Sequence, residues 1–143
     1  MAKIENYEMP DELYYHQEHA WVRVEGPDTV VVGMNDMFQK TAGDIVYVDL
    51  PFSGDEVSQG DVCGKVQSSK WIGKLVTPIS GEILEVNDEL SSNSALINTA
   101  PYSEGWIMKI KPSALEGDLG KLYHKDTVPG WLQGEIAKAK KGS

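Results

Sequence analysis

Residues 61–78 read Asp61-Val-Cys-Gly-Lys-Val-Gln-Ser-Ser-Lys-Trp-Ile-Gly-Lys-Leu-Val-Thr-Pro78. Two apolar runs of similar length flank the small polar turn Ser68-Ser69-Lys70, which is typical of two extended arms joined as a hairpin. Lys65 and Lys74 fall within the arms, whereas Lys70 falls at or beside the tip. The stretch therefore predicts a β-hairpin that presents one lysine at its end.

Further extended segments lie on both sides of this hairpin. Residues 20–33 form two β-branched runs around a Gly-Pro-Asp turn, which predicts another hairpin. Single strands are expected at 44–51, 81–87 and 105–111, with a short extended piece in the acidic loop 54–60 and a loop at 91–94. A short helix is expected at 35–43, where Asn35 or Asp36 can cap its start and Gly43 can end it. Many short strands separated by turns predict a mainly β fold, a small antiparallel sandwich or flattened barrel.

The C-terminal part has helical character. Ser113-Ala-Leu-Glu116 fits a capping box, and residues 131–141 combine helix formers with a basic end. Two short C-terminal helices are therefore expected. No linker divides the chain, so we expect one domain over residues 1–143, with a core at about 14–112 and a helical extension at 113–141. Residues 1–10 and 142–143 are expected to fray.

Composition narrows the class of protein. The chain has 143 residues, with 13 basic and 22 acidic side chains, a net charge of −9 and a pI near 4.7. Such a charge repels phosphate backbones, so nucleic acid is not an expected partner. No apolar run reaches the roughly eighteen residues of a membrane span, and the first ten residues lack the apolar core of a signal peptide. A cytoplasmic protein without a membrane partner is expected.

Lys70 is the residue that most suggests a function. An exposed lysine is usually only a solvated charge. Here it follows two serines, lies between two apolar arms and precedes Trp71, whose ring can pack on the hairpin and stiffen the tip. A rigid tip that presents an amine suits covalent attachment of a group-carrying cofactor such as lipoate or biotin.

Other candidate sites have weaker support. His16 and His19 have a zinc-like spacing around Glu18, but nothing nearby clearly offers a third ligand, so a structural role is favoured. Cys63, the single cysteine, has no adjacent base in sequence and is expected to be an inert thiol. The chain contains no glycine-rich nucleotide motif and no hydrolase Gly-x-Ser-x-Gly. Acidic residues that could steer docking to basic partners are Asp36, Asp44, Asp49, Asp55, Glu56 and Asp61.

Spaced matches from about Tyr14 to Pro112 resemble the H-protein family of the glycine cleavage system. They comprise His19 and Trp21, Val32-Gly-Met-Asn-Asp36 with Gln39, Gly43-Asp-Ile-Val-Tyr-Val-Asp-Leu-Pro51, Gly54-Asp-Glu-Val57, Pro78-Ile-Ser-Gly-Glu82, Glu85-Val-Asn87, Leu96-Ile-Asn98, and Pro101-Tyr-Ser-Glu-Gly-Trp106. The resemblance implies a hybrid-motif lipoyl sandwich with C-terminal helices. It also implies a lipoyl-lysine at Lys70, in a carrier that is not itself an enzyme.

The tip residues Gln67, Ser68, Ser69 and Trp71 complete the expected cofactor site. Biotin carriers of related fold present Met-Lys-Met, whereas this chain has Ser69-Lys70-Trp71, so lipoate is favoured. The resemblance implies modification by a lipoate ligase or lipoyl transferase, and reoxidation by dihydrolipoyl dehydrogenase.

Three positions depart from the family pattern. H proteins of glycine cleavage typically carry Glu three residues before the lysine, Ala after it, and Glu after the histidine; these positions hold Gln67, Trp71 and Ala20. The run Lys70-Trp-Ile-Gly-Lys-Leu75 is similar to lipoate-binding paralogues of the sulfur-oxidising heterodisulfide-reductase-like complex. We therefore expect that complex as partner, with an H protein that carries the aminomethyl group between glycine cleavage enzymes as the alternative.

Two further classes of function remain open on the residues alone. One is a scaffold domain that keeps the sandwich without lipoate, since a fold does not fix a function. The other is a small enzyme that uses Cys63 or the pair His16 and His19. The scaffold hypothesis predicts an unmodified Lys70. The enzyme hypothesis predicts that substitution of Cys63 or of the two histidines abolishes activity, whereas Lys70→Arg leaves activity intact.

Overall fold

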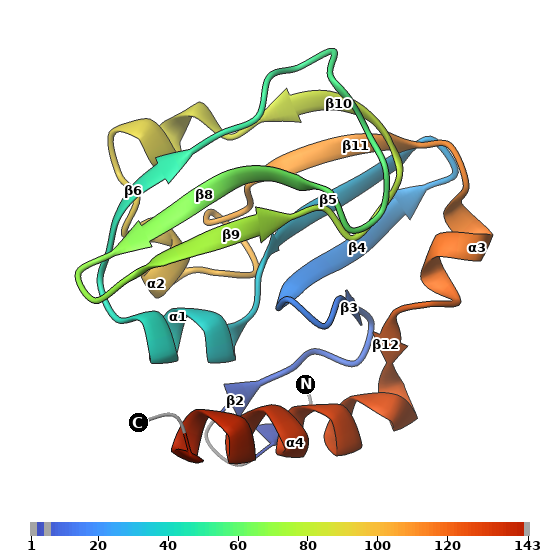
Figure 1. Cartoon of the computed structure of the whole chain (residues 1–143). Coiled ribbons are helices and arrows are strands. Elements are labelled where there is room, and N and C mark those ends of the chain that lie inside the picture. Colours follow the sequence, from blue (N-terminus) through green and yellow to red (C-terminus); the bar gives the residue numbers. More distant parts are fainter. Residues whose placement is uncertain (1–2, 5–6, 142–143) are drawn as a thin grey trace.

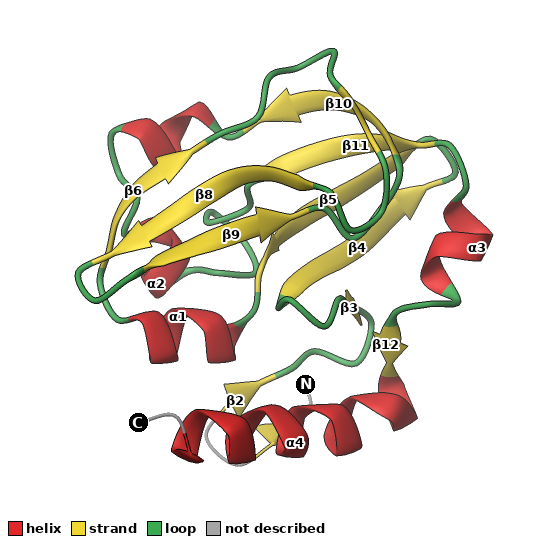
Figure 2. Cartoon of the chain, in the orientation of Figure 1, coloured by secondary structure: helices red, strands yellow, loops and turns green. Residues whose placement is uncertain are grey.

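The computed structural model describes residues 3–4 and 7–141 of the chain, and it is dominated by β-strands (Figures 1 and 2). The strands are β1 (Lys3–Ile4), β2 (Tyr7–Glu8), β3 (Tyr14–Tyr15), β4 (Ala20–Gly26), β5 (Thr29–Met34), β6 (Ile45–Asp49), β7 (Glu56–Val57), β8 (Val62–Ser68), β9 (Ile72–Val76), β10 (Gly81–Val86), β11 (Met108–Pro112) and β12 (Tyr123–His124). The helices are α1 (Asp36–Ala42), α2 (Leu96–Thr99), α3 (Leu115–Leu119) and α4 (Val128–Lys141), with 3-10 turns η1 (Asp88–Ser91) and η2 (Lys125–Thr127).

Two antiparallel sheets form a sandwich. The larger sheet has the strand order β12-β3-β4-β5-β11-β10-β7, and the smaller sheet has the order β6-β8-β9. Their facing sides share a cluster of buried side chains that includes Val22 and Val32 from the larger sheet and Val66 and Leu75 from the smaller. Alternate residues of a strand point to opposite faces, so apolar residues at every second position fill this core. The predicted sandwich is confirmed.

The opposite face of the larger sheet is also buried. Trp21 and Val31 point to this side, where α4 and the N-terminal segment cover them (Figure 1). Leu132 and Ile136 contribute from α4, and Met9 contributes from the segment before β3. These contacts place α4 close to the connection between β3 and β4, where the site described below is found.

Several sequence-based expectations need correction at the ends of the chain. Residues 7–10 do not fray: β2 pairs with β1, and Met9 is buried in the second cluster. Residues 1–2, 5–6 and 142–143, which were also expected to fray, lie outside the described part. The predicted loop at 91–94 is confirmed except at Ser91, which is the last residue of η1; α2 begins after the loop, at Leu96.

The capping box at Ser113 is absent, although a helix follows. Helix α3 begins after Ala114, which makes no side-chain cap, and the Ser113 N–H instead donates to the carbonyl of Ser80. The Asp118 carboxylate accepts from the Ser80 N–H at 2.7 Å, so contacts with the loop before β10 hold this segment. Helix α4 begins at Val128, three residues before the start of the helix predicted at 131–141. Among the described residues, no helix is long and apolar enough to span a membrane.

Candidate functional site

The β8–β9 hairpin ends in a tightly bonded turn that carries Lys70. The Ser68 hydroxyl accepts from the N–H groups of Lys70 and Trp71, each at 3.1 Å, and donates to the Trp71 carbonyl. The Ser69 N–H donates to the carbonyl of Asp44, which ties the tip to the residues after α1. Ser68 is buried and satisfies backbone groups, so it holds the turn rather than contacting a cofactor.

The Lys70 side chain lies across Gly43, the residue that ends α1. Gly43 has a φ of +79°, in the region that favours glycine, and a Cβ added there would lie 3.3 Å from the Lys70 Cε. The absence of a side chain at Gly43 leaves room for the lysine stem. Lys70 itself is exposed, and among the described residues no acidic side chain forms an ion pair with it. Its amine is available for acylation.

Trp71 stiffens the tip, as the sequence predicts. Its ring meets Phe38 of α1 edge to face, with ring centroids 5.5 Å apart, and remains 41% exposed. A Cβ at Gly73 would lie 2.7 Å from the Trp71 ring and 3.2 Å from Phe38, so glycine is required for this packing. The aromatic pair locks the hairpin onto α1 and fixes where Lys70 stands.

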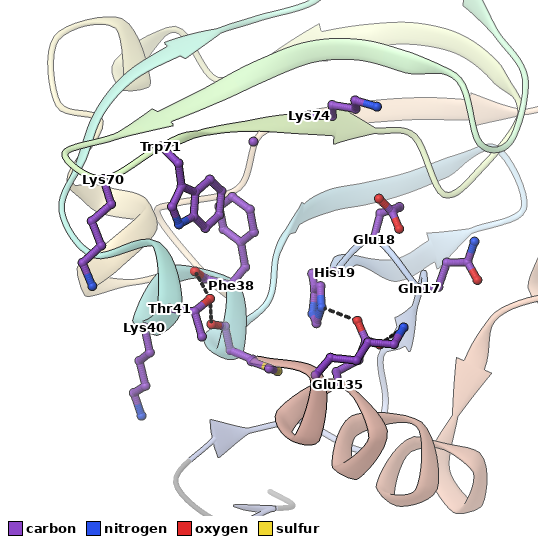
Figure 3. Close-up of a pocket in the computed structure, with 13 residues that line it drawn as sticks. Gln17, Glu18, His19, Phe38, Lys40, Thr41, Lys70, Trp71, Lys74 and Glu135 are labelled. Carbon is purple, nitrogen blue, oxygen red and sulfur yellow. Dashed lines mark hydrogen bonds and ion pairs between the residues drawn. The ribbon is translucent and has the colours of Figure 1, made fainter. Parts of the chain in front are cut away.

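A groove of about 760 Å³ opens beside the tip (Figure 3), a size typical of small-molecule sites. Four segments line it: the hairpin tip, α1, the β3–β4 connection and α4. Met37, Phe38 and Trp71 give it an apolar wall. Its lining residues are Gln17, Glu18, His19, Met37, Phe38, Lys40, Thr41, Lys70, Trp71, Gly73, Lys74, Glu135 and Lys138.

His19 joins the groove to α4. Its Nε2 lies 3.0 Å from the Glu135 carboxylate, and its Nδ1 lies 3.1 Å from the Asn35 amide nitrogen. The Asn35 oxygen already accepts from the Phe38 N–H, so its NH₂ group must donate to Nδ1. The bonds therefore assign the tautomer with hydrogen on Nε2, which donates to Glu135 (Figure 3). His19 also adopts a φ of +75°, which directs its ring toward α4.

The stability of the protein should fall as the pH drops below the ordinary histidine pKa of 6.5. Burial lowers the pKa of His19, and the attraction of Glu135 offsets this only partly. The unfolded chain therefore takes up a proton at a higher pH than the folded chain, which favours unfolding as the pH falls through this window.

Chemical denaturation at about pH 7.5 and 5.5 measures this difference, and a His19→Asn variant, whose residue tolerates positive φ, should show a shallower dependence. Some dependence should persist, because burial also lowers the pKa of His16. An unchanged slope in the variant would show that His19 is not the titrating group.

The other sequence-predicted candidates lie away from Lys70 or serve packing. Burial raises the pKa of Cys63 to about 11, so its thiol is protonated at neutral pH and unsuited to nucleophilic attack. His16 accepts from the Glu18 N–H through Nδ1, and both ring nitrogens of His19 are engaged by protein groups. The described residues contain no group of three ligands suited to a metal ion.

The predicted acidic surface is only partly correct. Asp36 is buried at 6% exposure, bonded to the Glu8 N–H and paired with Lys40 at 2.9 Å, so it is a structural residue. Asp55, Glu56 and Asp61 do gather on the surface, around a shallow hollow at the base of the β8–β9 hairpin. The acidic cluster therefore lies at the end of the hairpin opposite Lys70.

Comparison with known proteins identifies the family. The family model described as "Glycine cleavage H-protein" matches residues 13–133, most of the chain. The chain belongs to the glycine cleavage H-protein family. Members of this family carry lipoate covalently attached to a lysine and are non-catalytic components of a multienzyme system. The chain is therefore a lipoate carrier and not an enzyme.

Individual relatives agree with this assignment. The chain is 42% identical over 133 residues to a "Probable glycine cleavage system H protein" of Pyrococcus horikoshii, covering 93% of this chain and 98% of the relative. It is 47% identical over 106 residues to a glycine cleavage system H protein of Anaeromyxobacter sp. (strain K), covering 74% and 82%. The crystal structure of a glycine cleavage system H protein from Mycobacterium marinum matches with a TM-score of 0.76 and 30% identity, over 89% of this chain and 98% of that one.

Some parts of the H-protein site are not evident from sequence spacing. Glu135 lies far from Lys70 along the chain, and no periodicity links it to His19. Gly43 is predicted as the end of a helix, but not as the surface under the lysine stem. The groove forms only when α4 packs on the sheet, and this tertiary contact has no local signal.

Proposed function

We propose that the lipoyl group is attached to Lys70 and that the chain carries the one-carbon amine unit of glycine between the enzymes of glycine cleavage. The observation that supports this best is an exposed amine at a rigid hairpin tip, beside a groove of about 760 Å³, in a chain of the H-protein family. The tip neighbours Gln67, Ser69 and Trp71 form the surface around the arm, and Ser68 holds the turn.

The tip residues fit an acylated lysine. The Lys70 ammonium first loses one proton to solvent, and the neutral amine then attacks the carbonyl carbon of an activated lipoyl donor. The bond from that carbon to the leaving group breaks, and the nitrogen gives up a second proton to solvent as the amide forms. No electrons are transferred, and the tip loses one positive charge. The stem has space over Gly43, and no ion pair among the described residues has to break. When bound, lipoate supplies a disulfide that nucleophiles can open and redox partners can close again.

The groove gives the arm a sheltered position close to its attachment point. Met37, Phe38 and Trp71 provide an apolar wall that excludes water, while His19 and Glu135 fix the position of α4 at the opposite side. These residues shelter a reactive group and catalyse no step. We propose that residues 1–143 act as one carrier unit in the cytoplasm, with α4 as part of the groove.

The expected partners are a lipoate ligase or lipoyl transferase, the glycine cleavage enzymes and dihydrolipoyl dehydrogenase. An exchange assay tests the pathway directly. Lipoylated protein is incubated with glycine decarboxylase, glycine and labelled bicarbonate, and label in the carboxyl group of glycine is measured. We expect lipoylated chain to support exchange and unmodified chain to give background only. Background exchange with fully lipoylated chain, beside an active H protein as control, would contradict the glycine pathway.

Sulfur oxidation with a heterodisulfide-reductase-like complex is the second candidate. The features that favour it are Trp71 and Gln67 at the tip, with Ala20 buried in the core instead of a carboxylate. Lys74 adds a positive charge at the groove rim, and this charge is unfavourable for the cationic amine of a glycine-derived unit on the lipoyl arm. Exchange at background level, together with sulfur-dependent electron transfer to that complex, would favour this candidate.

A further inference from the structure

The outer face of the small sheet carries a mixed apolar and cationic surface next to Lys70. The register aligns Tyr47 with Gln67 and Gln67 with Ile72 in the row nearest the tip. The next row aligns Asp49 with Lys65 and Lys65 with Lys74. We call these six residues the tip face: Tyr47, Asp49, Lys65, Gln67, Ile72 and Lys74.

The first row is unusually apolar for a solvent-facing position. Tyr47 is 55% exposed and Ile72 is 62% exposed, whereas Val48 and Val66, which alternate with them, are buried. The core therefore uses the other side of these strands, and nothing in the described chain covers the outer side. Trp71 turns to the opposite side, onto Phe38 and Gly73 in the groove, so Tyr47 and Ile72 form the apolar part of the tip face.

The second row places like charges opposite each other. Lys65 and Lys74 are directly paired across β8 and β9, an arrangement that costs stability. Within the described residues, neither lysine forms an ion pair. An edge lysine can protect a sheet against edge-to-edge aggregation, which accounts for Lys74 on β9. It does not account for Lys65, because β8 is the central strand.

The charge of this face is opposite to that of the chain. Within the tip face Lys65 and Lys74 supply two ammonium groups against the single carboxylate of Asp49, in a protein of net charge −9, and Lys70 stands next to them at the tip. Most of the molecule repels a partner surface that carries carboxylates, whereas the tip face attracts it. The charge pattern therefore orients an acidic partner toward the tip.

The reach of Lys70 identifies the partner that needs this face. Before modification the amine stands on a stem of only four carbons, so an enzyme that acylates it must bring its own active site against the tip. Enzymes that act on a lipoyl group work at the far end of a much longer arm. We propose that the tip face docks the enzyme that forms the amide at Lys70, through an apolar centre flanked by carboxylates that meet Lys65 and Lys74.

This inference rests on the proposed acylation of Lys70, and it has a consequence for product release. Amide formation removes the ammonium group of Lys70, which stands next to the docking surface. The modified chain should therefore bind the enzyme more weakly than the unmodified chain does, which favours release of the product.

Acylation kinetics test the docking proposal. The unmodified chain is incubated with ATP, lipoate and a purified lipoate–protein ligase, and lipoylated product is measured by mass. Charge reversal of both lysines, Lys65→Glu with Lys74→Glu, should lower kcat/KM about tenfold, mainly through KM, because two charge-pair interactions are lost. The matched control is Lys121→Glu with Lys125→Glu, which makes the same change in net charge at exposed positions near β12 (Figure 1) and should stay within about twofold.

A neutral pair of substitutions separates docking from folding. Lys65→Gln with Lys74→Gln removes the repulsion between the two lysines, so it should unfold at the same or a higher temperature while kcat/KM still falls about threefold. Equal kcat/KM for the parent, the control and both tip-face variants would overturn the docking proposal and leave the function intact. No acylation of the parent chain, with the ligase active on another lipoyl protein, would instead overturn the acylation of Lys70.

Discussion

A Lys70→Arg chain takes up no lipoyl group and supports no carrier activity, while its unfolding temperature equals that of the parent. Arginine keeps the positive charge and a similar apolar stem, so it can lie across Gly43 as lysine does. Its guanidinium stays protonated at neutral pH and cannot form a stable lipoyl amide. Intact mass after incubation with lipoate ligase, ATP and lipoate, followed by the exchange assay, measures both losses.

Cys63→Ala is the control for this result. The Cys63 thiol has a pKa raised to about 11 by burial and lies outside the groove lining, so its loss should leave lipoylation and carrier activity unchanged. The opposite pattern, in which Cys63→Ala abolishes activity and Lys70→Arg retains it, would support a small enzyme in place of a carrier.

A Trp21→Ala chain should lose about 3–5 kcal/mol of its free energy of unfolding, the usual cost of deleting a fully buried large aromatic ring. Trp21 is 0% exposed, and its indole N–H donates to the carbonyl of Pro101 at 2.9 Å. Its ring lies over Gly33, where a Cβ would approach to 2.6 Å. Because Trp21 packs in the cluster shared with α4, the loss should also loosen the groove.

Trp71→Ala is the matched control, since it removes the same side chain from a site that is 41% exposed. It should cost about 1 kcal/mol or less, mainly the edge-to-face contact with Phe38. For a chain of this size the two variants should then differ by about 5–15 °C in unfolding temperature. Equal unfolding temperatures in a thermal melt would show that α4 and the second cluster contribute little to stability.

The sandwich and the tip could be predicted because their signals are local. The alternation in residues 61–78 and the turn at Ser68-Ser69-Lys70 are encoded in adjacent residues, and the structure has β8, the turn and β9 in that order. Asn35 and Gly43 similarly bound α1 through their own capping preferences. Residues whose conformation depends on near neighbours are therefore the ones that sequence patterns place correctly.

The groove could not be predicted, because its parts meet only through tertiary packing. Glu135 reaches His19 because α4 packs on Trp21 and Val31 of the larger sheet, a contact with no local signal. Asp36 was expected on an acidic surface, yet its carboxylate is buried, where it accepts from the Glu8 N–H and pairs with Lys40. The cross-strand pairing of Lys65 with Lys74 follows the register that continues from the turn to Gly64, and the bulge between Val62 and Gly64 changes the pairing only beyond it.

Peptide mapping of the protein isolated from its native host shows whether Lys70 carries the lipoyl group. Intact mass gives the number of lipoyl groups, and fragmentation of the peptide that contains Lys70 locates them. We expect one lipoyl group, on Lys70, and none on Lys65 or Lys74. A bare Lys70 in protein from cells that lipoylate their other carriers, or a lipoyl group on a different lysine, would contradict this expectation.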